Sequence, residues 1–121
     1  MSNPADKAVF RLVALLLILA GSAAAAELTF DIRIEGGRIP DAMRLIRVHE
    51  GDGVKLRWTS DRALVLHLHG YDIEKRVAGD GVTEFSFTAN ATGRFPIEIH
   101  GAAGSAAHGG TPLAVIEVYP R

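Results

Sequence analysis

The chain of 121 residues contains no cysteine. This absence excludes disulfide bonds, and it excludes every metal site that depends on a thiolate ligand. Helical periodicity is also absent after residue 26, where apolar side chains alternate with polar ones instead. The stability of the fold must therefore come from an apolar core, helped at most by a bound ligand or a partner subunit.

A strong charge of either sign is missing as well. Lysine and arginine together number 13, aspartate and glutamate number 14, and the net charge is −1 at pH 7. Aromatic residues make up only 7% of the chain. A nucleic-acid-binding surface needs a basic patch, usually with interleaved aromatic side chains, and the sequence offers neither. We expect no nucleic-acid partner.

The one long apolar run lies at the N-terminus. Lys7 and Arg11 supply positive charge, the run Leu12 to Ala20 follows, and a stretch of small residues ends in Ala24-Ala25-Ala26. This order is typical of a secretory signal peptide, in which small residues precede the cleaved bond. An uncleaved membrane anchor is the alternative, because the alanines can lengthen the apolar segment.

Residues 1–26 are therefore predicted to be a signal peptide that is cleaved before Glu27. Residues 27–121 remain as a single domain, since that length supports one hydrophobic core. We expect the protein to be periplasmic or secreted.

Short segments in which apolar and polar residues alternate recur along this domain. They predict strands at residues 28–34, 44–48, 54–59, 63–69, 72–77, 84–88, 94–100 and 113–119. Turns rich in glycine, aspartate and asparagine separate the segments, a spacing typical of an antiparallel β-sandwich of seven or eight strands. The irregular stretch 36–43 is expected to cross between the two sheets.

Histidines supply the most specific chemical signal. His67 and His69 alternate at the end of the strand 63–69, so their side chains share one face, about 7 Å apart along the backbone. The leucines of that strand form the opposite, apolar face. His100 ends the strand 94–100, again on the face away from the predicted core. The three imidazoles can meet only if these two strands are neighbours in a sheet.

Several other side chains lie near this pattern. His108 falls in the glycine- and alanine-rich segment 101–110, and His49 belongs to a predicted turn at the far end of a strand. Glu98 and Asp72 are candidate hydrogen-bond acceptors that would fix the tautomer of a ligating histidine. The alternative is that all of these histidines are ordinary solvated surface residues.

Five short motifs together resemble the cupredoxins, the Greek-key β-sandwiches of blue copper proteins and multicopper oxidase domains. The motifs are Val48-x-x-Gly51-Asp52-x-Val54-x-Leu56, His67-Leu68-His69-Gly70-Tyr71-Asp72, Phe85-x-Phe87-x-Ala89, Gly93-Arg94-Phe95 and Ile116-Glu117-Val118. The resemblance covers nearly all of residues 27–121 and implies a cupredoxin-like fold.

The copper ligands of that family are only partly present. A blue copper site needs a cysteine thiolate, two imidazoles and usually an axial methionine. Ile99 stands where the resemblance places the cysteine, and Leu64 stands where multicopper oxidases carry the first histidine of their motif. No sulfur lies near Pro112 and Leu113, and the only methionine after the leader is Met43. The resemblance therefore implies a copper site without blue-copper electron transfer.

The same resemblance implies a histidine-rich metal site. His67, His69 and His100 match positions that face the type 2 and type 3 coppers of multicopper oxidases, with Glu98 at the fourth position. His108 lies in a loop that often supplies a C-terminal copper ligand in the family. We predict His67, His69, His100 and His108 as metal ligands.

Imidazole ligands suit Cu(II), Zn(II) and Ni(II), and the usual order of affinity favours Cu(II). Copper is therefore the expected ion, with zinc as the alternative. No serine–histidine–acid pattern or phosphate-binding loop is present, so we expect metal binding or delivery and no enzymatic activity.

Two other functions remain open. The domain can be a module that binds a periplasmic or membrane protein, in which case the histidines are incidental. It can also be half of an interfacial copper site, completed by a second subunit in an oligomeric copper enzyme.

Overall fold

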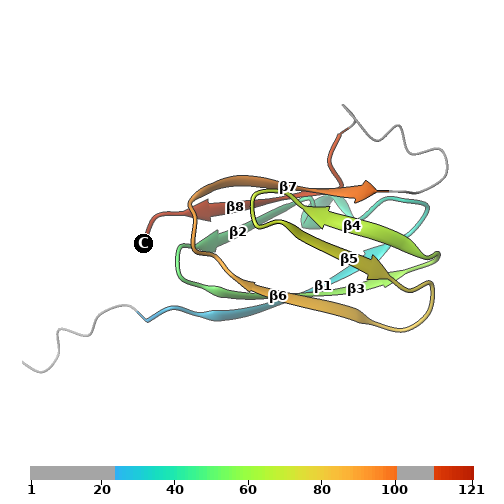
Figure 1. Ribbon diagram of the computed structural model, residues 1–121, viewed down its shortest axis with the longest axis horizontal. Helices are drawn as coiled ribbons and strands as arrows, with labels where there is room; N and C mark the ends of the chain where they lie inside the picture. Colours follow the sequence, from blue (N-terminus) through green and yellow to red (C-terminus); the bar gives the residue numbers. More distant parts are fainter. Residues whose placement is uncertain (1–23, 101–110) are drawn as a thin grey trace, which may run out of the picture.

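The computed structural model describes residues 24–100 and 111–121. Within this part of the chain, eight strands form two facing sheets, and one short 3-10 helix lies between two of the strands in sequence (Figure 1). In chain order the elements are β1 (Glu27–Ile34), η2 (Asp41–Met43), β2 (Leu45–His49), β3 (Gly53–Ser60), β4 (Leu64–Leu68), β5 (Ile73–Val77), β6 (Thr83–Thr88), β7 (Gly93–His100) and β8 (Ala114–Tyr119). The predicted β-sandwich is confirmed.

The sheets are mixed, whereas the sequence predicted an antiparallel sandwich. One sheet has the order β1-β3-β6 and the other the order β2-β8-β7-β4-β5. The pairs β1–β3 and β2–β8 are parallel, and the remaining pairs are antiparallel. Alternation reports which face of a strand is buried and carries no information on the direction of its neighbour. The two parallel pairs could therefore not be seen in the sequence.

The connection between β1 and β2 crosses from one sheet to the other, as predicted for residues 36–43. An isolated bridge pairs Glu35 with Arg38, and η2 follows directly before β2. The chain thus adds β1 to the three-stranded sheet and β2 to the five-stranded sheet.

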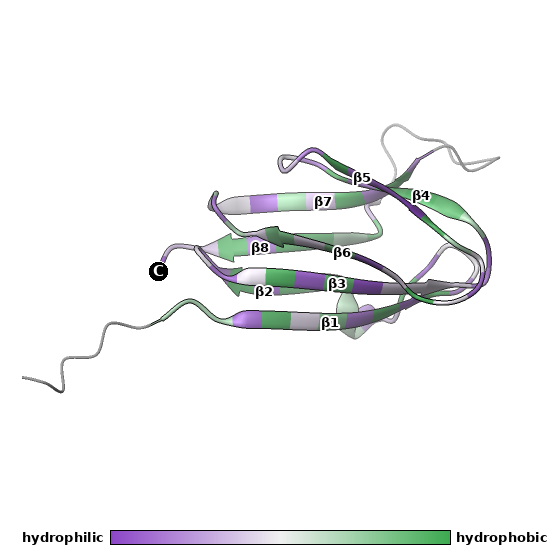
Figure 2. Cartoon of the chain, turned by 60° about the horizontal axis from the view of Figure 1, so that its bottom comes forward, coloured by the Kyte–Doolittle hydropathy of each residue, from purple (hydrophilic) through white to green (hydrophobic). Residues whose placement is uncertain are grey.

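The core lies between the two sheets and is built by the alternation seen in the sequence. Figure 2 shows apolar and polar residues alternating along β3, where Val54, Leu56 and Trp58 are buried. The Trp58 ring stacks against Phe85 of β6 at a centroid distance of 6.2 Å. Apolar burial of this kind is the main driving force for folding. The predicted core faces of these strands are confirmed.

Two turn residues set the ends of the strands around the histidines. The predicted segment 63–69 forms a strand only to Leu68, because Gly70 follows with φ 87°. Asp72 has φ 55° and therefore precedes β5, although it was predicted to open that strand. His69 still extends the pairing, since its backbone N–H donates to the carbonyl of Pro96 at 3.0 Å.

Candidate metal centre

The two histidine-bearing strands are neighbours. In the antiparallel pair β4–β7, Val65 lies opposite His100, Leu66 opposite Ile99 and His67 opposite Glu98. The leucines of β4 are buried, and the residues between them face away from the core. The condition that the sequence left open is therefore met: His67, His69 and His100 lie on the outer face of the five-stranded sheet.

The three imidazoles converge on one another. Their ring centroids are 4.2 Å apart for His67 and His69, 4.8 Å for His67 and His100, and 5.7 Å for His69 and His100. One ligand nitrogen from each ring lies within 4.8 Å of the other two. Bonds from zinc or copper to imidazole nitrogen are about 2 Å long, so the rings are close enough to share one ion.

All three side chains are partly open to solvent. The exposed fraction is 19% for His67, 39% for His69 and 30% for His100. An ion can therefore enter or leave from the face of the sheet without passing through the core.

A buried nitrogen of His67 supports the fit of a metal. His67 Nδ1 is buried and has no hydrogen-bond partner among the described residues. Leaving such a polar atom unsatisfied costs about 1–3 kcal/mol. Coordination of an ion would satisfy an imidazole nitrogen, and the donor set of three imidazoles suits copper. The residues present therefore fit a metal ion.

Two carboxylates lie beside the rings. Glu98 Oε2 is 3.0 Å from His69 Nε2, a hydrogen-bonding distance, and 3.7 Å from His100 Nε2. Asp72 Oδ1 is 3.6 Å from His67 Nε2, too far for a hydrogen bond, and its side chain is fully exposed. Glu98 is therefore within hydrogen-bonding distance of an imidazole, and Asp72 is not.

Gly70 fixes the chain directly after His69. A Cβ atom added at Gly70 would lie 2.3 Å from Cδ1 of Phe95, and the positive φ favours glycine. Tyr71 then packs edge-on against Phe95 at 4.8 Å, and its hydroxyl donates to the carbonyl of Ala91 at 2.8 Å. In the sequence, Gly70 ends the apolar run 63–69, and this position was the available signal for its structural role.

The other candidate residues lie elsewhere. His108 falls outside the described residues, so its role as a ligand stays a prediction. His49 ends β2, and its ring lies 6.2 Å from that of Tyr119. Among the described residues, the group that can hold a metal consists of His67, His69 and His100.

The positions to which the resemblance assigns the missing copper ligands hold hydrocarbon side chains. Leu64 is buried in the core, and Ile99 and Met43 pack against that core. Met43, the only methionine after the leader, therefore belongs to the packing around the core.

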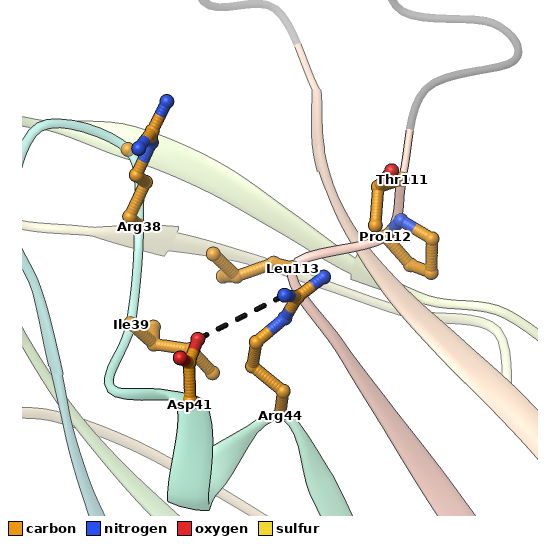
Figure 3. A pocket seen from close by; sticks show the side chains of 8 residues that line it. Arg38, Ile39, Asp41, Arg44, Thr111, Pro112 and Leu113 are labelled. Carbon is orange, nitrogen blue, oxygen red and sulfur yellow. Dashed lines mark ion pairs between the residues drawn. The ribbon is translucent and has the colours of Figure 1, made fainter.

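A separate hollow of about 410 Å³ lies between η2 and the start of β8. Figure 3 shows Arg38, Asp41 and Arg44 around it, with Arg44 Nη1 3.8 Å from Asp41 Oδ1. None of the three histidines lines it.

In residues 24–100 and 111–121, no helix is long and apolar enough to cross a membrane.

Comparison with known proteins places the fold. No family model matches the sequence, and no curated protein matches it. A copper nitrite reductase from Nitrosomonas europaea superposes with a TM-score of 0.60 and 16% identity, over 78% of this chain and 42% of that chain. A copper binding protein in its apo form superposes with a TM-score of 0.56 and 11% identity, over 80% and 92%.

A chain of a heme-copper terminal oxidase dimer is similar over nearly the whole length of both proteins. The superposition covers 97% of this chain and 99% of the oxidase chain, with a TM-score of 0.57 and 13% identity. This chain spans about two fifths of the nitrite reductase chain. At these identities the likeness establishes architecture alone: the protein has a cupredoxin-like fold, in a variant without the type 1 cysteine.

Proposed function

We propose that this protein is an exported Cu(II)-binding protein whose ion is held by His67, His69 and His100. One observation carries the proposal: a single β-sheet pairing brings three imidazoles to within ligand distance of one another on an accessible face. Surface histidines scattered for solubility would have no reason to converge in this way.

The choice of copper rests on ligand chemistry. Imidazole-only donor sets follow the general order of divalent affinities, in which Cu(II) exceeds Ni(II) and Zn(II). Similar solved structures include a copper nitrite reductase and a copper binding protein, which supports the same ion.

The role we propose is binding and delivery or storage of copper, without electron transfer or catalysis. Fast blue-copper electron transfer depends on a thiolate ligand, and Ile99 occupies the position that the resemblance gives to that cysteine. Side chains that are 19–39% exposed suit an ion that must be loaded and released.

The compartment we propose is the periplasm. The positively charged start, the apolar run and the small residues up to Ala26 support export. A domain without cysteine gains nothing from an oxidising compartment through disulfides, and it carries no thiol that copper would oxidise.

A competition titration tests this function. The mature domain is titrated with Cu(II) against a chromogenic chelator, and the double variant His67→Ala/His69→Ala and the control His49→Ala are treated in the same way. We expect one Cu(II) per chain, loss of tight binding in the double variant and no change in the control, because His49 lies outside the cluster. Equal and weak binding by all three proteins would rule out the site and favour an interaction module.

A further inference from the structure

The carboxylate of Glu98 lies beside two of the three imidazoles, those of His69 and His100. Glu98 is the Cα partner of His67 across β4 and β7, so its side chain stands on the same outer face. Its Oε2 atom reaches both His69 and His100, at 3.0 and 3.7 Å from their Nε2 atoms. Within the described part of the chain, no arginine or lysine forms an ion pair with Glu98. The negative charge is thus available to a cation held by the rings.

An orienting carboxylate and a ligand carboxylate make different contacts. An orienting group accepts a hydrogen bond from the N–H of one ring, whose other nitrogen binds the metal. Glu98 instead presents one oxygen to the same nitrogen, Nε2, of two rings. The two separations bracket the distance of about 3.3 Å between donor atoms that share one tetrahedral ion with bonds near 2 Å.

We propose that Glu98 is the fourth ligand, which makes the site a three-histidine, one-carboxylate set. This inference rests on the proposed function and deepens it. A carboxylate is a hard, negatively charged donor, whereas Cu(I) is selected by soft sulfur ligands. The chain has no cysteine, and Met43 packs against the core. The ion that this site takes is therefore oxidised Cu(II) in preference to Cu(I).

The test compares Glu98→Gln with Asp72→Asn, a matched removal of a carboxylate that contacts a single ring. The electron paramagnetic resonance spectrum of bound Cu(II) and the affinities for Cu(II) and Cu(I) are measured for each. We expect Glu98→Gln to weaken Cu(II) binding by more than about a hundredfold, the upper limit for loss of an orienting group, to shift the g and hyperfine values, and to leave Cu(I) affinity unchanged. Asp72→Asn should change none of these.

The outcomes separate this inference from the proposed function. If Glu98→Gln weakens Cu(I) and Cu(II) equally and leaves the spectrum unchanged, Glu98 only orients His69 and the ligand assignment is wrong. If the unmodified protein binds no Cu(II), the proposed function itself fails. Melting of the metal-free variants should match that of the unmodified protein, which shows that folding is retained.

A second, independent observation concerns the start of β1. The backbone N–H of Ala26 donates to Asp52 Oδ1 at 3.0 Å, and the backbone N–H of Gly53 donates to the carbonyl of Ala26 at 2.9 Å. Asp52 is only 2% exposed, and the Arg121 guanidinium pairs with the same carboxylate. Ala26 therefore belongs to the hydrogen-bonded fold, at the end of the sandwich where the C-terminus also lies (Figure 1).

The sequence predicts cleavage before Glu27, but residues 21–26 are all small, so the small-residue rule also permits a cut one or more residues earlier. Cleavage before Glu27 would remove both hydrogen bonds of Ala26: Gly53 N–H would lose its acceptor, and Asp52 Oδ1 would keep only the Arg121 guanidinium. Cleavage before Ala26 keeps both bonds and replaces the amide by an ammonium group beside the carboxylate. Hydrogen bonds between charged groups are about twice as strong as neutral ones.

The geometry points to Ala26 as the first residue of the exported protein, with its α-ammonium group paired to Asp52. This inference depends on the proposed export and is independent of copper. Intact mass spectrometry of the protein, expressed with its leader and purified from a bacterial periplasm, tests it directly. We expect a single chain that begins at Ala26. A chain that begins at Ala25 or Glu27, or that keeps the leader, would overturn the assignment.

The ion pair itself has a separate test. Acetylation of the amino group of the chain that begins at Ala26 should lower its melting temperature, and the same acetylation in Asp52→Asn should have a smaller effect. Equal effects in both proteins would show that the ammonium group does not pair with Asp52.

Discussion

Glu98 lies opposite His67 across the β4–β7 pair, on the face of the sheet that points away from the core. This pairing fixes which residues can share an ion. A shift of one residue in register would turn the side chains of one strand to the other face of the sheet. The buried leucines of β4 prevent such a shift, so the core determines the geometry of the proposed metal site.

Substitution of Gly70 is expected to damage both folding and copper binding. In Gly70→Ala the new Cβ would overlap Cδ1 of Phe95, and the residue would keep a φ of 87° that alanine rarely adopts. We expect a loss of about 2 kcal/mol in the free energy of unfolding, with weaker Cu(II) binding because His69 shifts. Denaturant unfolding and copper titration measure the two effects.

Gly36→Ala is the matched control, since Gly36 has φ 58° and no atom lies within 4 Å of its added Cβ. Gly36→Ala should lose only the smaller amount of stability that a positive φ costs alanine, and it should keep its copper affinity. Equal losses in both variants would contradict the proposed role of the Phe95 contact.

Acid should destabilise the metal-free fold through Asp52. Hydrogen bonds from the backbone N–H groups of His49 and Ala26, and the nearby Arg121, hold the pKa of Asp52 below its ordinary value of 3.8. A carboxyl group with a lowered pKa in the folded state stabilises the protein above the unfolded pKa and loses that contribution as the pH falls through the folded pKa.

We therefore expect the melting temperature to fall as the pH drops below about 4, and Asp52→Asn to be less stable at neutral pH with a flatter acid dependence. Thermal melts from neutral to acidic pH compare the two proteins. If the melting temperature of Asp52→Asn falls with pH as steeply as that of the unmodified protein, other carboxylates cause the loss of stability in acid.

Copper should stabilise the folded protein. A ligand that binds only the native state adds about 2.7 kcal/mol when its concentration is a hundred times the dissociation constant. Addition of Cu(II) should raise the melting temperature, and a chelator should reverse the change. His67→Ala/His69→Ala should show no such shift, because a single imidazole of the cluster is left and cannot hold the ion tightly. Stabilisation of the double variant by the same amount would place the ion elsewhere.

Alternation along the strands was enough to predict which faces are buried. Leu64, Leu66 and Leu68 are buried, and His67 and His69 lie on the other face, as predicted. Strand order and direction could not be predicted from alternation, because a strand can bury its apolar face equally well beside several different neighbours. The parallel pair β1–β3 shows this limit.

The site could likewise be predicted only in part, because the sequence shows the face of each strand but not its neighbours. The histidine faces followed from local periodicity, whereas the contact of Glu98 with two rings depends on the β4–β7 register and on side-chain rotamers. The ligand role of His108 stays a prediction from the sequence.

The central claim is that imidazoles from β4 and β7 share one Cu(II) ion. Pulsed electron paramagnetic resonance on the copper-loaded protein counts the imidazole rings bound to the ion. We predict at least three rings in the unmodified protein, one fewer in His100→Ala and no specifically bound Cu(II) in His67→Ala/His69→Ala. A spectrum without bound imidazole, or one that these substitutions leave unchanged, would contradict the claim.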